Sequence, residues 1–176
     1  FHLRKIAYGQ YEPPSLLEHV TRLTQDGRYD THILKDYTPE EFAELDAEIQ
    51  HERDLNFAYA AVKQLEGKYL LQDRVTKKVY ESPQFLYMLV AMCLFANYPK
   101  ATRLDYAKRF YNAVSTFKIS LPTPIMSGVR TPSRQFSSCV LIECGDSLDS
   151  INATTSAIVK YVSQRAGIGI NAGRIR

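Results

Sequence analysis

The chain has 176 residues, 45% of them hydrophobic and 23% charged, an ordinary globular composition that excludes a disordered chain. No apolar run approaches the roughly 20 residues that span a bilayer, so a membrane-spanning protein is excluded as well. Three cysteines at irregular spacing do not make a disulfide framework, and we therefore expect a cytoplasmic protein.

The net charge of +3 is concentrated in residues 130–176, which hold six basic and three acidic groups. This excess fits a small anionic ligand such as a phosphate but is too slight for a nucleic-acid-binding face. Scattered surface arginines explain it equally well. The six basic residues are Arg130, Arg134, Lys160, Arg165, Arg174 and Arg176.

The first three-quarters of the chain predicts helices joined by short turns. Residues 1–8 are typical of the end of a helix, so we expect the chain to be a piece of a larger protein. Ser15-Leu16-Leu17-Glu18 and Thr38-Pro39-Glu40-Glu41 are predicted capping boxes, in which a hydroxyl and a glutamate each bond a free amide. A helix is expected over residues 54–66, ending at Gly67.

The middle of the chain predicts a small β-hairpin and two more helices. Residues 68–72 and 77–80 flank a polar turn, which is the hairpin pattern. Ser82-Pro83 begins a strongly apolar helix over residues 84–97 that must be buried on nearly all sides, and another helix is expected over about 101–117. The prolines of Leu121-Pro122-Thr123-Pro124 predict an extended segment, followed by a polar linker over residues 127–134.

The last quarter of the chain predicts one β-α-β unit. A strand over residues 137–143 is followed by a helix from Ser147 to about Arg165 and a strand over residues 167–171. We therefore predict a mainly helical domain with a small β-hairpin over residues 1–134, and the start of an α/β sheet or barrel over residues 135–176. The apolar stripe of the last helix comprises Leu148, Ile151, Ile158, Val159 and Val162.

Two cysteines lie on the predicted strand. Cys139 and Cys144 are separated by about 16 Å on opposite faces, whereas a disulfide needs Cα atoms within about 7 Å. Local physics favours core packing for both, and for Cys93 in the apolar helix, because cysteine is often buried. A reactive Cys139 needs a partner thiol outside this chain.

The turn after this strand is a candidate anion site. Asp146 and Ser147 lie where the strand gives way to a helix N-terminus, where backbone amides favour negative charge. Asp146 either caps the helix, its more common role, or accepts a hydrogen bond from a sugar hydroxyl. The glycines of residues 167–173 fall in a strand and do not make a dinucleotide fingerprint. None of the four histidines has a metal-ligand spacing.

Four motifs together resemble one family. Residues 121–124 (Leu-Pro-Thr-Pro), 134–139 (Arg-Gln-Phe-Ser-Ser-Cys), 143–150 (Glu-Cys-Gly-Asp-Ser-Leu-Asp-Ser) and 163–169 (Ser-Gln-Arg-Ala-Gly-Ile-Gly) resemble the large (alpha) subunit of class I ribonucleoside-diphosphate reductase, bacterial class Ia type. The resemblance covers essentially the whole chain. It implies an internal fragment that starts after a regulatory ATP domain and stops after the second strand of a ten-stranded α/β catalytic barrel.

The resemblance implies a substrate site. Cys139 corresponds to one of two thiols that reduce the ribose 2′ carbon and become a disulfide, with its partner beyond this chain. Thr123 and Ser138, together with the backbone of Ala166 and Gly167, correspond to positions that bind the ribonucleoside diphosphate.

The resemblance also implies allosteric sites. Asp146, Ser147, Leu148 and Arg176 correspond to a specificity site for a dNTP or ATP effector, with the aspartate on the deoxyribose hydroxyl and the arginine on the phosphates. Lys5 corresponds to a lysine that reaches an ATP activity site. The helix that starts at Ser147 resembles the one that packs across the two-fold axis of a homodimer.

Cofactors and partners follow from the same resemblance. The chain is expected to hold no cofactor or metal, because the family takes its radical from a metal-containing small subunit and its electrons from thioredoxin or glutaredoxin. No nucleic acid or membrane is expected as a partner, and the fragment alone is predicted to be inactive. Two alternatives are a non-catalytic nucleotide-binding regulator of the same fold and a helical interaction module with inert cysteines.

Overall fold

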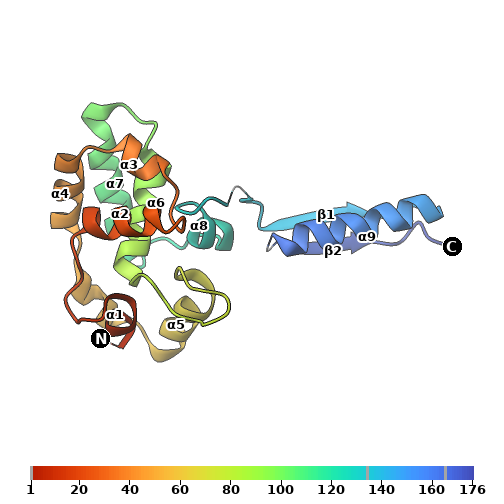
Figure 1. The fold of residues 1–176 in the computed structure, drawn as a ribbon. Coiled ribbons are helices and arrows are strands. Elements are labelled where there is room, and N and C mark those ends of the chain that lie inside the picture. The colour runs from red at the N-terminus through yellow and green to blue at the C-terminus, as the bar shows by residue number, and fades with distance from the viewer. Residues whose placement is uncertain (1, 134, 165) are drawn as a thin grey trace. The chain divides into compact units, whose positions relative to one another are not determined.

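The computed structural model describes every residue except Phe1, Arg134 and Arg165 (Figure 1). Contacts divide the chain into two units, Phe1–Ser133 and Arg134–Arg176. The first unit contains α1 (His2–Tyr8), α2 (Leu16–Gln25), α3 (His32–Asp36), α4 (Pro39–Glu48), the 3-10 helix η1 (His51–Asn56), α5 (Tyr59–Gln64), the π-helical turn η2 (Leu65–Tyr69), α6 (Pro83–Phe95), α7 (Lys100–Ser115) and α8 (Thr123–Gly128). The second unit contains β1 (Cys139–Glu143), α9 (Leu148–Ser163) and β2 (Gly167–Asn171).

The helix α6 forms the centre of the helical unit's core. All ten residues from Pro83 to Met92 are buried, and α7, α8 and η1 contact this helix. A helix that is apolar on every side requires cover on every side, and the surrounding helices provide it (Figure 1). The predicted buried helix is therefore confirmed.

Local capping rules hold at the start of two helices. At α4 the Thr38 hydroxyl accepts from the Glu41 amide at 3.3 Å, and the Glu41 carboxylate accepts from the Thr38 amide at 2.8 Å. This reciprocal pair confirms the predicted capping box. At α2 the Ser15 hydroxyl accepts from the Glu18 amide at 3.3 Å, which is the serine half of the predicted box.

The predicted helix over residues 54–66 is wrong. The chain forms the short 3-10 helix η1, becomes extended at Phe57, and resumes as α5 and the π-helical turn η2, which runs past Gly67. Asp54 accepts a hydrogen bond from Gln84 at 2.9 Å and pairs with Arg4 at 3.3 Å. These distant contacts hold η1 against the core instead of letting one helix continue. The following hairpin is present as a single antiparallel bridge between Gln72 and Val79.

The predicted extended segment and polar linker are wrong in part. Thr123 and Pro124 form the first turn of α8, where proline is tolerated because its missing amide would have no partner. Pro122 keeps the expected extended backbone, and Leu121 also lies outside the helices. The predicted linker is helical up to Gly128 and then buries Arg130 completely, and its last residue, Arg134, lies outside the described residues.

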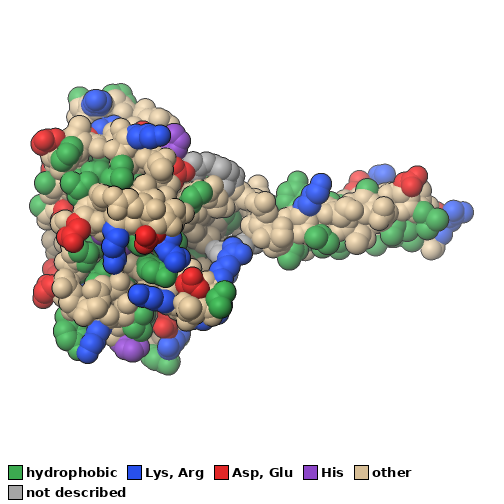
Figure 2. Space-filling model, in the orientation of Figure 1, with side chains coloured by type: hydrophobic (Ala, Val, Ile, Leu, Met, Phe, Trp, Pro, Cys, Tyr) green, Lys and Arg blue, Asp and Glu red, His purple; other side chains and the backbone are tan. Residues whose placement is uncertain are grey.

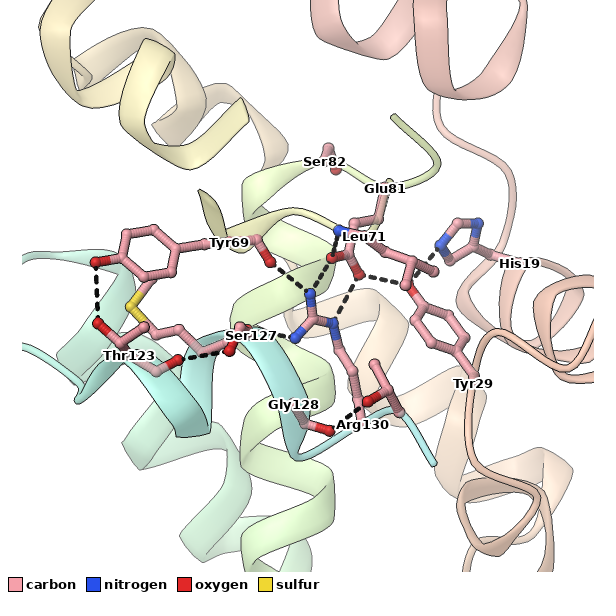
Figure 3. A network of polar contacts seen from close by, with 12 residues as sticks. His19, Tyr29, Tyr69, Leu71, Glu81, Ser82, Thr123, Ser127, Gly128 and Arg130 are labelled. Atoms are coloured by element: carbon pink, nitrogen blue, oxygen red, sulfur yellow. Dashed lines mark hydrogen bonds and ion pairs between the residues drawn. The ribbon is translucent and has the colours of Figure 1, made fainter. Parts of the chain in front are cut away.

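A buried ion pair joins Arg130 to Glu81, and neither side chain is exposed to solvent (Figure 3). The Arg130 Nε donates to Glu81 Oε2 at 2.9 Å, and its Nη2 pairs with Oε1. The Tyr29 hydroxyl donates to Oε2 at 2.5 Å, and the Leu71 amide donates to Oε1 at 2.6 Å. Both carboxylate oxygens are thus satisfied twice, which is the condition under which a buried charge pair is tolerated.

Arg130 also holds three segments of main chain together. Its guanidinium donates to the carbonyl of Tyr69 at 3.0 Å and to the carbonyl of Met126. Its own carbonyl accepts from the Asp30 amide at 2.9 Å. The residue therefore joins η2, α8 and the segment after α2, none of which is adjacent to another in sequence.

His19 extends this network as a neutral side chain. Its Nε2 lies 3.1 Å from the Tyr29 oxygen, and the Tyr29 proton is already donated to Glu81. The Nε2 must therefore carry the histidine proton and donate it to Tyr29. The ring stacks on Phe85 with centroids 4.8 Å apart. Burial lowers the pKa of His19 to about 3.

The second unit is a parallel β-α-β arrangement, as predicted. The strands β1 and β2 pair from Cys139 opposite Gly167 to Glu143 opposite Asn171, and α9 contacts both strands. The predicted end of this helix, about Arg165, lies outside the described residues. Exposed and half-buried residues alternate along β1, so within this unit it is not a core strand.

Replacing Arg130 tests how much the buried Arg130–Glu81 pair contributes to the free energy of unfolding. Arg130→Met leaves the Glu81 carboxylate buried without its counter-charge, so we expect a loss of about 3–5 kcal/mol in the free energy of unfolding. Urea denaturation followed by circular dichroism measures the change. Arg109→Met is the matched control, because Arg109 and its partner Asp105 are largely exposed and should contribute little. Equal losses in the two variants would contradict the assignment.

His19 predicts a dependence of stability on pH. Its pKa is about 3 in the folded chain and about 6.5 when unfolded, so the unfolded chain binds the proton first as the pH falls. The stabilisation is complete above pH 6.5 and is lost between about pH 6.5 and 3, by at most about 1.4 kcal/mol per pH unit. We expect the free energy of unfolding to fall less between pH 7 and 5 in His19→Gln than in the unchanged chain. Identical slopes would rule out this contribution.

Candidate functional site

Four of the predicted substrate-site residues meet at one end of the strand pair. Cys139 lies opposite Gly167 in the register, and the Gly167 amide donates to the carbonyl of Ser138 at 2.9 Å. Ala166 is buried, and its amide donates to the carbonyl of Tyr161 at 3.1 Å, which fixes the entry into β2. The parallel pairing therefore brings Ser138, Cys139, Ala166 and Gly167 together.

The thiol at this end is open to solvent. Cys139 is exposed, and its Sγ lies 3.9 Å from the hydroxyl of the exposed Ser138. The local expectation that Cys139 packs in a core is therefore wrong, because within this unit the helix covers only one side of a two-stranded sheet. Cys144, at the exit of the same strand, is buried, as expected. Of these two thiols, only Cys139 can meet a ligand or another thiol.

The predicted effector residues lie at the opposite end of β1, about 13 Å along the strand from Cys139. Asp146 accepts from the Arg176 amide at 3.2 Å, and its second oxygen pairs with the Arg176 guanidinium. Ser147 caps α9 by accepting from the Ser150 amide at 3.1 Å. Capping is thus done by Ser147, and the expectation that Asp146 caps the helix is wrong.

Leu148 and the rest of the predicted stripe lie open on α9. Leu148 is 86% exposed, and Ile151, Val159 and Val162 are exposed as well, while Ile158 is half-buried. On the visible face of this unit, Figure 2 shows several hydrophobic side chains and only a few charged ones. An exposed apolar face of this kind is a candidate contact surface.

The basic excess of the last segment is partly neutralised within the chain. Arg174 pairs with Glu143 at 2.8 Å, and Arg176 pairs with Asp146. Arg130 is fully buried against Glu81, out of reach of a ligand at the surface. Its inclusion in an anion-binding excess was therefore wrong. Arg134 and Arg165 lie outside the described residues.

Thr123 belongs to the helical unit, at the first position of α8 (Figure 3). Its hydroxyl lies 3.4 Å from the hydroxyl of Tyr69, and its carbonyl accepts from the Ser127 hydroxyl at 2.9 Å. The side chain is half-buried. Thr123 thus presents a hydroxyl that has one protein neighbour and is partly open to solvent.

Lys5 lies on α1, exposed, with its Nζ 5.6 Å from the centre of the Tyr11 ring. The neighbouring Arg4 is drawn inward to Asp54 at 3.3 Å. Positive and negative side chains are interspersed on the visible face of the helical unit (Figure 2).

Among the described residues, no group of three His, Cys, Asp or Glu side chains is placed to hold a metal ion. Across the same residues, no helix is long and apolar enough to cross a membrane.

Two features near these positions were not predicted. Tyr69 reaches Thr123 across 54 residues of sequence, and Arg174 reaches Glu143 from beyond β2. No local pattern signals the Tyr69 contact, because it depends on how η2 and α8 pack together. The pair between Arg174 and Glu143 could have been predicted from the β-α-β unit, because parallel pairing brings the ends of both strands together.

Comparison with known proteins matches both units to one family. Residues 55–134 match the family model described as the all-alpha domain of ribonucleotide reductase, and residues 137–176 match the one described as its barrel domain. All 176 residues align with ribonucleoside-diphosphate reductase 1 subunit alpha of Escherichia coli at 76% identity. They align with subunit alpha of Haemophilus influenzae at 71% and of Enterobacteria phage T4 at 53%.

The alignment covers 100% of this chain but 23% of each of these three relatives. The resemblance carried by the four sequence motifs is thereby confirmed over the whole chain, as is the order of a helical domain before the start of a barrel. The chain belongs to the ribonucleotide reductase family, and it contains residues of the all-alpha domain followed by the start of the barrel domain of the alpha subunit.

Proposed function

We propose that the protein containing this chain reduces ribonucleoside diphosphates to deoxyribonucleoside diphosphates. The observation that carries the proposal is the exposed Cys139 thiol, beside the Ser138 hydroxyl and the Gly167 backbone, in a chain 76% identical to a named reductase alpha subunit. The relatives' names do not favour the non-catalytic regulator or the helical interaction module.

The proposed reaction needs two thiols. Two thiols lose two electrons and two protons to form a disulfide, while the C2′–OH bond of the ribose breaks, a C2′–H bond forms and water leaves. Cys139 is proposed as one of the thiols. Cys144 is buried and too far along the same strand to form a disulfide with Cys139. The second thiol is therefore proposed to come from another part of the alpha subunit. A metal-containing small subunit supplies the radical that starts the reaction, and thioredoxin or glutaredoxin reduces the disulfide.

Binding of the substrate is assigned to hydroxyls and main chain. Thr123 and Ser138 each present a hydroxyl that can donate to a phosphate oxygen, and the Ala166–Gly167 backbone lines the same end of the strand pair as Cys139. Hydroxyl donors hold a phosphate without adding a fixed charge, which suits a substrate that must be released as product.

The far end of the strand pair is proposed as the effector site. There Asp146 and Arg176 form a paired carboxylate and guanidinium, next to the N-terminus of α9 capped by Ser147. A dNTP or ATP offers a sugar hydroxyl to the carboxylate and phosphates to the guanidinium, with Leu148 as an apolar contact. Lys5, on the exposed side of α1, is proposed to contribute to a separate ATP activity site.

The exposed stripe of α9 is proposed as the homodimer contact. Leu148, Val159 and Val162 are open to solvent in this chain and are of the size and type found in the core of a permanent interface.

The three free cysteines fit a reducing compartment, and we propose that the protein is cytoplasmic.

The first prediction from this proposal concerns the two thiols of one strand. In the full alpha subunit assembled with its small subunit, Cys139→Ser removes one electron donor, and deoxynucleotide formation should fall to the detection limit. Cys144→Ser is the matched control, because that thiol is buried away from the site, and it should retain activity. Radiolabelled product formation measures both. Full turnover by Cys139→Ser would overturn the role of Cys139.

The second prediction concerns the effector site. Asp146→Asn removes the charge that pairs with Arg176, so we expect the affinity of the full alpha subunit for a dNTP to fall about tenfold. Asp149→Asn is the control, because Asp149 lies in the same first turn of α9 and has no assigned contact with the nucleotide. Equilibrium dialysis gives both dissociation constants. Equal affinities in the two variants would remove Asp146 from the site.

A further inference from the structure

The hydroxyls of Tyr69 and Thr123 come from segments that are distant in sequence. Tyr69 is the last residue of the π-helical turn η2, and Thr123 is the first residue of α8. Their oxygens lie 3.4 Å apart, and either can act as the donor. Figure 3 shows the Tyr69 ring directed toward Thr123, with its main-chain carbonyl directed the opposite way, toward Arg130.

The main chain on both sides of this contact is held by one buried residue. Arg130 donates to the carbonyl of Tyr69 at 3.0 Å and to the carbonyl of Met126, one turn after Thr123. Arg130 is itself fixed by its bidentate pairing with Glu81. The main chain that carries the two hydroxyls is therefore held by the buried network, through bonds that do not involve the Tyr69 hydroxyl.

The surroundings of Tyr69 suit an anionic ligand at Thr123. The Lys68 ammonium lies 5.4 Å from the centre of the Tyr69 ring and is exposed. Tyr69 itself is half-buried.

A threonine hydroxyl has one proton and two lone pairs. When Thr123 donates its proton to a phosphate oxygen, it can only accept from Tyr69, so the Tyr69 proton must point at Thr123. Hydrogen bonds in such a chain polarise and strengthen one another. Without the Tyr69 hydroxyl, the Thr123 proton loses the partner that keeps it directed at the ligand.

We propose that Tyr69 is a positioning residue for the substrate diphosphate, acting through the hydroxyl of Thr123. This inference rests on the proposed assignment of Thr123 to the phosphates. It adds a residue that touches no substrate atom and whose contribution appears only when Thr123 has its hydroxyl.

The test is a double-mutant cycle in the full alpha subunit, read out as the dissociation constant for CDP. Tyr69→Phe removes one oxygen, leaves the carbonyl bonded to Arg130, and should weaken CDP binding about threefold to tenfold. Thr123→Val should weaken it at least as much. In the Thr123→Val background, Tyr69→Phe should have no further effect, because the partner hydroxyl is already absent.

Tyr80→Phe is the matched control. It removes a hydroxyl that accepts from Arg28 at 2.9 Å in the same hairpin region and has no contact with Thr123. Its CDP affinity should equal that of the unchanged protein. Binding of dTTP should be the same in all variants, which excludes a general loss of structure.

Each outcome decides one question. An unchanged affinity in Tyr69→Phe, or the same loss with and without the Thr123 hydroxyl, overturns the role of Tyr69. An unchanged affinity in Thr123→Val overturns the assignment of Thr123 to the phosphates, on which the inference rests. No CDP binding by the unchanged protein overturns the proposed function itself.

Discussion

The buried pairing of Glu81 with Arg130 is the constraint on which the helical unit depends. The segments around it have little regular structure of their own: a π-helical turn, a single β-bridge and the six-residue helix α8. Main-chain groups in such segments need partners from elsewhere. Glu81 accepts from Tyr29 and Leu71, and Arg130 donates to Tyr69 and Met126. The ion pair thus provides hydrogen-bond partners for main-chain groups that a longer helix or a sheet would otherwise pair with one another.

How far the fold could be predicted depended on the distance between the interacting residues. The capping box at Thr38 and the apolar run of α6 follow from neighbours in sequence, and both were predicted correctly. The break at η1 was missed because Asp54 is held by Gln84, 30 residues away, and by Arg4, 50 residues away. Arg130 was expected in a polar linker for the same reason, since its partner Glu81 is 49 residues distant.

The site shows the same division. The local pattern marked the Asp146 turn as a candidate anion site, but it favoured helix capping for Asp146 and a buried Cys139. The functional roles of both residues were proposed through the family resemblance. Both local expectations failed because they treated β1 as a core strand and the turn after it as an isolated one. The unit instead has a two-stranded sheet with α9 against it, and Arg176 returns to bind Asp146. The contact between Arg176 and Asp146 forms only when β2 is paired with β1. It could therefore not be predicted from the residues next to Asp146 in sequence.

Arg130 recognises Tyr69 and Met126 only by their carbonyl oxygens, which every amino acid possesses. Substitution of either side chain leaves these two carbonyl acceptors in place for Arg130. Tyr69 therefore has two separate roles. Its carbonyl accepts from Arg130 and stabilises the fold, and its hydroxyl is proposed to act on the ligand through Thr123. A protein built in this way can retune a binding surface while its framework stays as it was.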